Sequence, residues 1–258
     1  MGVITFLGTG TSQGVPVVSC NCYVCRSKDP HDKRLRTSAM VDVGGKRLVI
    51  DCGPDFRQQM LREDVQHIDG IILTHNHKDH IGGLDDVRAF NYTSGKAVDV
   101  YAEESVQETI MNELPYAFGE HKYPGAPEIN LITIDESPFS AAGIDIIPVR
   151  GMHMKLPVLG FRIGGLCYIT DMNSIEESEL EKMKNLDVLV INTLRIEKHL
   201  SHFCLPESLD IISRLAPKCA YFTHMSHQIG LHAEISALTG SDKIQFAYDG
   251  LKVDFDER

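Results

Sequence analysis

Short apolar runs alternate along the chain with longer stretches in which apolar residues recur every three or four positions. The short runs predict β-strands, and the longer stretches predict amphipathic helices. Strands are expected at roughly 3–7, 38–43, 47–51, 70–74, 98–101, 131–134, 144–149, 159–163, 166–170, 187–191 and 219–223. Helices are expected at roughly 54–64, 83–90, 104–114, 174–184, 206–215 and 231–238. This alternation predicts an α/β protein, and on layer arguments alone it leaves open a doubly wound sheet or a two-sheet sandwich.

Local signals refine some of these boundaries. Gly44-Gly45 and Gly164-Gly165 each stand between two strand candidates and predict two-residue hairpin turns. Asn173 or Ser174 can cap the helix expected at 174–184. Residues 115–130 fit neither a helix nor a strand, so we expect a long irregular loop that is either a lid or a plain surface excursion.

Length and charge narrow the class of protein. The 258 residues contain no repeat and no linker-like tract, which favours a single domain over 1–258. The net charge of −11 opposes general nucleic-acid binding through bulk electrostatics. No apolar run is long enough to span a membrane, so no membrane association is expected. The first residues lack the basic start and apolar core of a signal peptide, which predicts a cytoplasmic location.

The chain has seven cysteines, an odd number that argues against a disulfide framework. Cys20, Cys22 and Cys25 lie within six positions, a spacing that favours thiolate binding of a metal ion. The other four are scattered, and Cys167 and Cys219 lie in apolar runs, where they are expected to be core residues.

Residues 74–83 hold the densest group of candidate metal ligands. His75, His77, Asp79 and His80 follow a short apolar run, so they are expected on a loop at the carboxyl end of a strand. Imidazole and carboxylate suit zinc, manganese and iron. Alternate residues of an extended segment point the same way, so His75 and His77 can share one metal. Asp79 and His80 lie beyond the bend and can serve a second metal.

The spacing H-x-H-x-D-H resembles the metallo-β-lactamase superfamily. The resemblance implies an αββα sandwich of two mixed sheets flanked by helices. It also implies further ligands at strand ends, where this chain has His153, Asp171 and His224. Carried over, one metal would bind His75, His77 and His153, the other would bind Asp79, His80 and His224, and Asp171 would lie between them. Two divalent ions, zinc or manganese, are therefore expected.

The N-terminal third adds a more specific resemblance. The glycine-rich turn Gly8–Gly14, the three clustered cysteines and nearly the whole length of the chain are similar to the PhnP family of phosphodiesterases in this superfamily. The resemblance implies a structural zinc ion bound by Cys20, Cys22, Cys25 and a histidine just after the last catalytic ligand. His227 holds that place, and His232 is the other candidate.

Several residues could act in catalysis. His202 lies 22 residues before His224, and the resemblance implies that it contacts the phosphate or acts as the general acid, with His199 as a weaker candidate. Asp79 could orient the attacking water as well as bind metal. Asp51 resembles an aspartate that steadies ligand imidazoles, and it could also cap the helix at 54–64. Arg34 or Arg36 could contact phosphate, although a solvated charged pair is the simpler interpretation.

The preferred function is a metal-dependent phosphodiesterase that hydrolyses a small cyclic or short phosphodiester, such as a ribosyl or nucleotide cyclic phosphate. A hydroxide held between the two metals would attack phosphorus. A thioester or ester hydrolase and a tRNase Z-like RNA phosphodiesterase are the alternatives, since both use the same ligand set. The expected partner is the small substrate, without a stable nucleic-acid complex, and the family resemblance makes a homodimer plausible.

Overall fold

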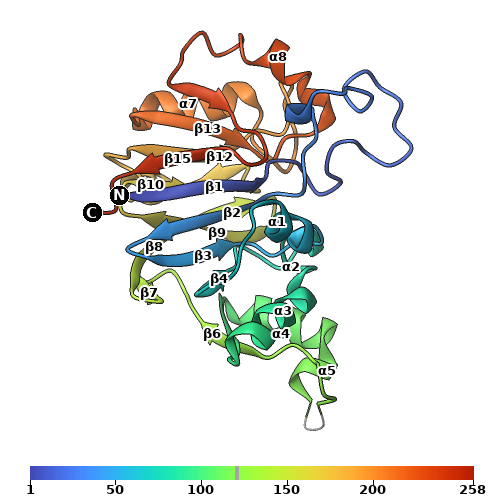
Figure 1. Cartoon of the computed structure of the whole chain (residues 1–258). Coiled ribbons are helices and arrows are strands. Elements are labelled where there is room, and N and C mark those ends of the chain that lie inside the picture. The colour runs from blue at the N-terminus through green and yellow to red at the C-terminus, as the bar shows by residue number, and fades with distance from the viewer. Residues whose placement is uncertain (120–121) are drawn as a thin grey trace.

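The computed structural model describes residues 1–119 and 122–258, which form two β-sheets packed face to face (Figure 1). One sheet has the order β15-β1-β2-β3-β4-β5-β6. Its strands are β1 Gly2–Gly8, β2 Ser38–Val43, β3 Lys46–Ile50, β4 Gly70–Ile72, β5 Val98–Ala102, β6 Ile129–Thr133 and β15 Lys252–Phe255. The other has the order β11-β8-β9-β10-β12-β13-β14, with β7 paired to β8. Its strands are β7 Phe139–Ala141, β8 Ile144–His153, β9 Leu156–Ile163, β10 Leu166–Tyr168, β11 Ser174–Ile175, β12 Val188–Asn192, β13 Cys219–Thr223 and β14 Ile244–Phe246.

Both sheets are mixed. Strands β1, β2 and β3 are antiparallel, whereas β3 to β6 run parallel. In the second sheet β8, β9 and β10 are antiparallel, and β10, β12, β13 and β14 run parallel. The hairpins at Gly44-Gly45 and Gly164-Gly165 form as expected, because Val43 pairs with Lys46 and Ile163 pairs with Leu166. The parallel strands of each sheet bring their carboxyl ends to a common edge.

Three apolar cores hold the layers together. The central one lies between the sheets and includes Ile4, Phe161 and Val190. A second packs α1 Phe56–Arg62, α3 Arg88–Ser94 and α4 Glu104–Glu113 on the outer face of the first sheet. A third packs α6 Glu177–Glu181 and α7 Leu205–Leu215 on the outer face of the second sheet. The result is the αββα sandwich, and the doubly wound alternative is excluded because the strands form two facing sheets.

Several predicted elements differ in the structure. The helix expected at 83–90 is a 3-10 turn at Leu84–Val87 that continues into α3. The helix expected at 174–184 is wrong in its first part, because Ser174–Ile175 pairs with β8 and α6 starts only at Glu177. The loop expected at 115–130 begins with the short helix α5 Pro115–Phe118 and ends in β6, and residues 120–121 lie outside the described residues.

The sequence pattern missed the short elements. Strands β7, β11, β14 and β15 have two to four residues, too few to show a period. The helices α2 Lys78–Ile81 and α8 His232–Ile235 each have four residues, and α8 is half as long as the helix expected at 231–238. Of these short elements, α2 is the most important for the site, because it carries two candidate metal ligands.

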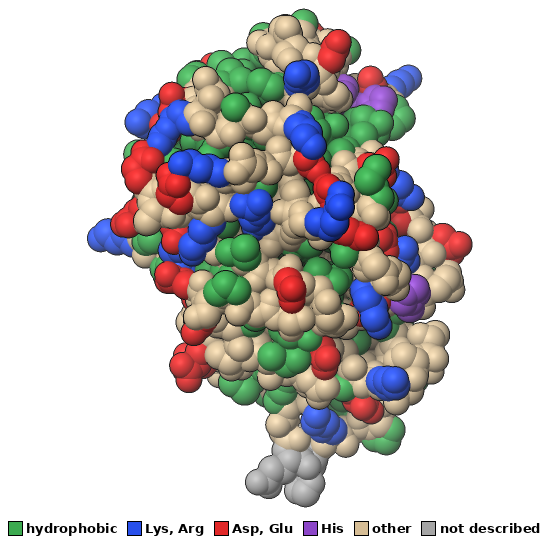
Figure 2. Space-filling view, turned by 90° about the vertical axis from the view of Figure 1, so that its left-hand side faces the viewer, with side chains coloured by type: hydrophobic (Ala, Val, Ile, Leu, Met, Phe, Trp, Pro, Cys, Tyr) green, Lys and Arg blue, Asp and Glu red, His purple; other side chains and the backbone are tan. Residues whose placement is uncertain are grey.

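The surface carries charges of both signs. On the face that includes both chain ends, Lys and Arg side chains are interspersed with Asp and Glu (Figure 2). Among the described residues, no helix has the length and apolar character needed to cross a bilayer.

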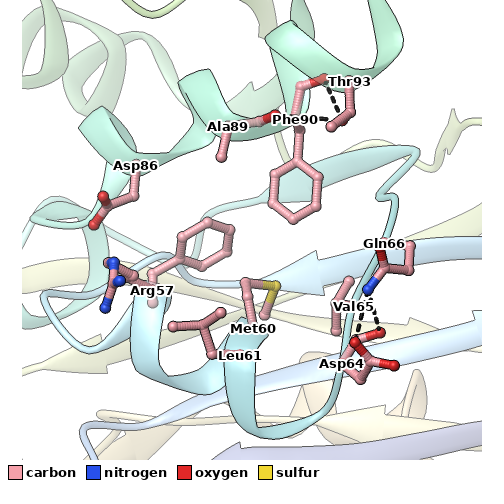
Figure 3. Close-up of a pocket in the computed structure, with 11 residues that line it drawn as sticks. Arg57, Met60, Leu61, Asp64, Val65, Gln66, Asp86, Ala89, Phe90 and Thr93 are labelled. Atoms are coloured by element: carbon pink, nitrogen blue, oxygen red, sulfur yellow. Dashed lines mark hydrogen bonds between the residues drawn. The ribbon is translucent and has the colours of Figure 1, made fainter.

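An apolar cleft lies between α1 and α3 (Figure 3). Its volume is about 250 Å³, and Met60, Leu61, Val65 and Phe90 line it. None of the candidate metal ligands lines this cleft, so we do not place the chemistry of the protein there.

Candidate metal centre

The central histidine cluster follows β4. The strand ends at Ile72, the chain continues extended to His77, and His77 is the residue that precedes α2. Asp79 and His80 lie inside this single-turn helix rather than on a plain loop. His75 is 2% exposed and His80 is fully buried, so both imidazoles face the interior. The bend at His77 therefore turns the four side chains toward one point at the edge of the sheet.

Strand ends of the second sheet supply the remaining candidates. His153 ends β8, Asp171 follows β10 by three residues, and His224 follows β13 directly. Asp171 lies at the centre of the combined cluster. One of its carboxylate oxygens, Oδ2, is 3.1 Å from Nε2 of His80 and 3.1 Å from Nε2 of His224. The other, Oδ1, is 3.8 Å from Nδ1 of His202.

Potential ligand atoms form three groups that share Asp171. The first holds His75 and His77, the second holds Asp79, His80 and His224, and the third holds His153 and His202. The structure thus brings all seven predicted dinuclear ligands together. It adds that His153 lies closer to His202 than to His77 or His75, since the imidazole centroids are 4.6, 5.0 and 6.2 Å from that of His153.

The hydrogen bonds around the histidines fit a metal centre. Thr74 has one hydroxyl hydrogen, which it donates to Asp51, so its oxygen accepts from Nδ1 of His75 at 2.9 Å. Nδ1 of His80 donates to Asp51 at 2.6 Å, and Nδ1 of His153 donates to the carbonyl of Ser201 at 2.7 Å. In all three, Nδ1 is engaged in the supporting bond, and Nε2 is the ring nitrogen left to bind a metal ion. Nε2 of His75 and His80 and both ring nitrogens of His224 are buried without a hydrogen-bond partner among the described residues.

The charges of the cluster are strongly coupled. Burial lowers the pKa of His75 below its ordinary value. Burial also acts to lower the pKa of His224, but the charge of Asp171 outweighs it and raises that pKa to about 9. Burial would raise the pKa of Asp79, yet the neighbouring imidazoles of His224 and His80 lower it. A bound cation would balance these carboxylates in place of imidazole protons.

Asp51 orients residues of the cluster through hydrogen bonds. It is fully buried, and it accepts hydrogen bonds from the backbone and hydroxyl of Thr74 as well as from His80. It does not cap α1, whose first turn is preceded by Asp55 instead. Asp51, Asp171 and His224 have φ angles of 64°, 56° and 55°, a left-handed conformation that is uncommon for these residues and clusters at functional sites.

His202 lies at the edge of the same cluster. Its side chain is mostly buried, and Nδ1 has no hydrogen-bond partner among the described residues. Burial and the nearby His224 lower its pKa to about 3, so the free imidazole is neutral. His199 stacks on the outer side of His202, with centroids 5.6 Å apart, and its Nδ1 contacts Ser201 instead of the centre. Of the two candidates, only His202 therefore reaches the metal-ligand cluster.

The three clustered cysteines meet His227 at a second point. Nδ1 of His227 is 3.3 Å from Sγ of Cys20 and 3.4 Å from Sγ of both Cys22 and Cys25. A tetrahedral zinc ion with ordinary bond lengths separates such atoms by about 3.5 Å. A hydrogen bond from the Cys25 backbone lowers the pKa of Cys22 to about 6, whereas burial raises that of Cys25 to about 11. His232 instead packs on His31 and Tyr248, so His227 is the histidine that completes this group.

The two arginines near the N-terminal turn are both engaged. Arg34 is 3% exposed, and its Nη1 donates to the hydroxyl of Thr9 and the carbonyl of Ala247. Its interpretation as part of a solvated charged pair is therefore wrong. Arg36 donates to both carboxylate oxygens of Asp55 and to the carbonyl of Ser12. Neither guanidinium contacts the metal-ligand cluster.

Sequence reasoning missed the supporting contacts of the site. Thr74 bonds to Asp51, the carbonyl of Ser201 bonds to His153, and the side chain of Asn173 bonds to Leu200, and in each case the partner lies more than 20 residues away in sequence. The expected cap, Asn173 or Ser174, is wrong, because Glu176 is the residue that precedes α6 and the side chain of Asn173 is bound to the backbone of Met154 and Leu200. No local pattern marks such contacts.

Comparison with known proteins agrees with this geometry. Residues 46–225 match the sequence profile of the β-lactamase superfamily domain. An octanoyltransferase of Porphyromonas gingivalis is 42% identical over 255 residues, which is 98% of this chain and 51% of that protein. The chain spans about half or less of the length of curated relatives that it matches.

Comparison with solved structures indicates the same superfamily. A crystal structure described as a diphosphatase from the PhnP family has a TM-score of 0.92 and 38% identity, and the match covers 100% of this chain and 99% of that one. The zinc-bound PqqB of Methylobacterium extorquens has a TM-score of 0.79 at 18% identity, covers 98% and 99%, and supports the fold. The ligand cluster, the two-sheet sandwich and these matches show that this chain belongs to the metallo-β-lactamase superfamily of hydrolases and, within it, to the PhnP family.

Proposed function

We propose that this chain is a metal-dependent phosphodiesterase that hydrolyses a small cyclic or short phosphodiester. The observation that carries the proposal is the convergence of seven imidazole and carboxylate side chains with Asp171 at their centre, where Nε2 of His75 and of His80 is buried without a hydrogen-bond partner among the described residues. A PhnP-family relative described as a diphosphatase supports phosphoryl chemistry over other reactions of the superfamily.

The residues divide into three metal positions. His75, His77 and His153 would hold one divalent ion, Asp79, His80 and His224 would hold the second, and Asp171 would contact both. Cys20, Cys22, Cys25 and His227 would hold a structural zinc ion. Zinc and manganese both suit the imidazole and carboxylate set. When bound, two such ions lower the pKa of a water molecule toward neutrality and offset the negative charge of a phosphate.

The protein's own side chains prepare the site. Asp51 fixes the ring orientation of His80 directly and that of His75 through Thr74, so their lone pairs stay directed into the cluster. Asp79 has one carboxylate oxygen 3.2 Å from His80, in a place where it could also orient the attacking water. The neutral imidazole of His202 would donate a hydrogen bond to a phosphate oxygen or to the leaving oxygen.

Two alternatives remain to be compared with this proposal. A thioester hydrolase would use the same ligands, and the P. gingivalis relative bears the name of an acyl-transfer enzyme. A tRNase Z-like activity is less favoured, because the net charge of −11 opposes the binding of a large polyanion. We accordingly propose a small-molecule substrate without a stable nucleic-acid complex. A homodimer stays a prediction from the family resemblance.

The test combines elemental analysis with a panel of substrates. Bis(p-nitrophenyl) phosphate, a 2′,3′-cyclic nucleotide, a nucleoside diphosphate, a tRNA precursor and an octanoyl thioester would be compared on the metal-loaded protein. The proposal expects about three metal ions per chain and turnover of at least one diester. It also expects His202→Ala to lower kcat by about 100-fold or more, and His199→Ala, its control, by less than threefold.

Other outcomes would reject specific parts. Turnover of the thioester without any diester turnover would replace the proposal by the thioester alternative. Turnover of the nucleoside diphosphate alone would move the substrate class to phosphoanhydrides. An unchanged kcat for His202→Ala on every active diester would remove His202 from the mechanism.

A further inference from the structure

We propose that Asn173 is a positioning residue that holds the loop bearing His202 against the metal centre. This inference rests on the proposed function, because the role of His202 is part of it. Asn173 follows Asp171 by two residues, and it is not itself a metal-ligand candidate. Its side chain joins the segment that follows His153 to the segment that precedes His202.

The side-chain amide of Asn173 makes one hydrogen bond in each direction. Its Oδ1 accepts from the backbone N–H of Met154 at 2.7 Å, and its Nδ2 donates to the carbonyl of Leu200 at 3.1 Å. Met154 directly follows the ligand candidate His153 in the turn between β8 and β9. Leu200 precedes His202 by two residues. One short side chain therefore connects the segment of a ligand to the segment of the proposed leaving-group residue.

The backbone of Asn173 is itself held in place. Its N–H donates to the carbonyl of Met152 at 2.8 Å, within the pairing between β11 and β8. The neighbouring Met172 is fixed by the side chain of Asn192, which both donates to and accepts from the Met172 backbone. The backbone of Asn173 is thus fixed to the second sheet by hydrogen bonds. Its side-chain amide can therefore hold the loop in place.

The loop that bears His202 needs such a restraint. The segment between β12 and α7 contains no helix or strand in the described structure, and its middle is open to solvent. Leu200 is 80% exposed, and the side chain of Lys198 is 81% exposed. Apolar packing therefore does not fix this part of the loop, and its position depends on hydrogen bonds.

Three contacts set the place of His202. The carbonyl of Leu200 accepts from Asn173, the carbonyl of Ser201 accepts from His153, and the N–H of Phe203 donates to Met172 at 2.8 Å. The partners in the last two bonds are His153, which is itself a ligand candidate, and Met172, which directly follows Asp171. Arg195 restrains the outer part of the loop through the carbonyls of Glu197 and Lys198 and through the side chain of Gln228. Asn173 is the side chain that ties Leu200 to the segment of His153 without itself being a ligand candidate.

The residue type fits both partners. The Met154 N–H requires an acceptor, and the Leu200 carbonyl requires a donor. An asparagine amide offers both on a short side chain. An aspartate would keep the bond to Met154, but it would place a carboxylate oxygen against the Leu200 carbonyl. Asn173→Asp therefore separates the loop contact from the turn contact, whereas Asn173→Ala removes both.

Asn91 provides a matched control. Its Nδ2 donates to the carbonyls of Lys96 and Glu128, and its Oδ1 accepts from the Glu128 backbone, so it also joins two segments with one amide. It lies at α3, away from the ligand cluster, and Asn91→Ala shows what the loss of such a bridge does when His202 is not involved.

The experiment measures kcat, KM and metal content for Asn173→Ala, Asn173→Asp and Asn91→Ala, each with and without His202→Ala. We expect both Asn173 variants to lower kcat by about 10- to 100-fold with KM changed less than threefold and all metal ions retained. In the His202→Ala background, the same changes should lower kcat by less than twofold, because the residue they position is gone. Asn91→Ala should leave kcat unchanged in both backgrounds.

Amide hydrogen exchange gives a readout that does not depend on activity. We expect faster exchange in residues 195–204 of both Asn173 variants, and not in Asn91→Ala. Equal losses of kcat with and without His202, loss of metal, or unchanged exchange in 195–204 would each overturn the inference. A wild-type protein inactive on every diester would instead reject the proposed function, and the exchange data would still decide whether Asn173 holds the loop.

Discussion

The chain brings metal-ligating side chains together at two points, and the two are built in opposite ways. The His/Asp cluster draws its members from five segments spread over residues 75–224 and both sheets. The cysteine cluster takes three thiols from six consecutive positions and adds His227 from one distant loop. The first needs the complete sandwich in order to exist, whereas the second is largely a local loop closed by a single long-range contact.

The groups that hydrogen-bond to the ligand side chains also differ between the two clusters. In the His/Asp cluster, ring nitrogens are oriented by Asp51, Thr74 and the Ser201 carbonyl. Among the described residues, the thiols accept hydrogen bonds from the backbone N–H groups of Val17 and Cys25, each at 3.4 Å. Four ligands at tetrahedral distances leave no open position, which is typical of structural zinc. Seven mixed ligands, one of them a shared carboxylate, leave room for substrate, which is typical of two-metal hydrolysis.

The two clusters are also joined. His224 belongs to the first, His227 belongs to the second, and the segment between them pairs with the N-terminal turn through Thr9 and Thr11. A metal ion in the cysteine cluster would therefore brace the last ligand of the other. The comparison suggests one centre for chemistry and one for support, and the following changes would test that division.

Asp171→Ala should have the largest effect on activity. It removes the carboxylate that lies 3.1 Å from both His80 and His224. We expect diester turnover to fall about 1,000-fold or more and the chain to keep about one metal ion, in the cysteine cluster. Kinetics and elemental analysis measure both. Asp187→Ala is the control, because Asp187 binds Lys218 and the Asp256 backbone away from the cluster. Full activity in Asp171→Ala would contradict the two-metal assignment.

Asp51→Ala should have an intermediate effect. It removes the hydrogen bonds that orient His80 and, through Thr74, His75, without removing a ligand. We expect metal affinity or kcat to fall about 10- to 100-fold, measured by metal titration and steady-state kinetics. Asp55→Ala is a matched control, because Asp55 also accepts several hydrogen bonds, but it accepts them from Arg36 and not from the cluster. Equal losses in the two variants would show a general folding defect.

Cys22→Ala should affect stability more than catalysis. We expect the loss of one metal ion, a fall of about 3 kcal/mol in the free energy of unfolding and about 10 °C in Tm, with kcat reduced less than tenfold at a temperature where the chain stays folded. Calorimetry and elemental analysis measure these quantities. Cys219→Ala and His232→Ala should keep all metal ions. Should His232→Ala lose an ion while His227→Ala keeps it, the fourth ligand has been assigned to the wrong histidine.

Sequence patterns located the long, periodic or motif-bearing features well. The central strands are at their predicted places, because buried runs such as 188–191 are apolar throughout. The metal-ligand candidates could be found because three of them follow buried strands and four share one motif. Prediction failed for α2, β7 and β11, which are too short to show a period, and for 174–184, where helix-favouring residues gave way to pairing with β8.

The sequence by itself determined which side chains could bind metal and which strands would carry them, because ligand types and strand periodicity are local properties. Only the tertiary structure decided that His227 rather than His232 meets the three thiols. It also showed that Arg34 is buried, that Asp51 orients His80, and that Asn173 joins Met154 to Leu200. Each of these contacts links residues brought together by the packing of two sheets, and no local pattern encodes the distance between segments that meet only in the folded chain.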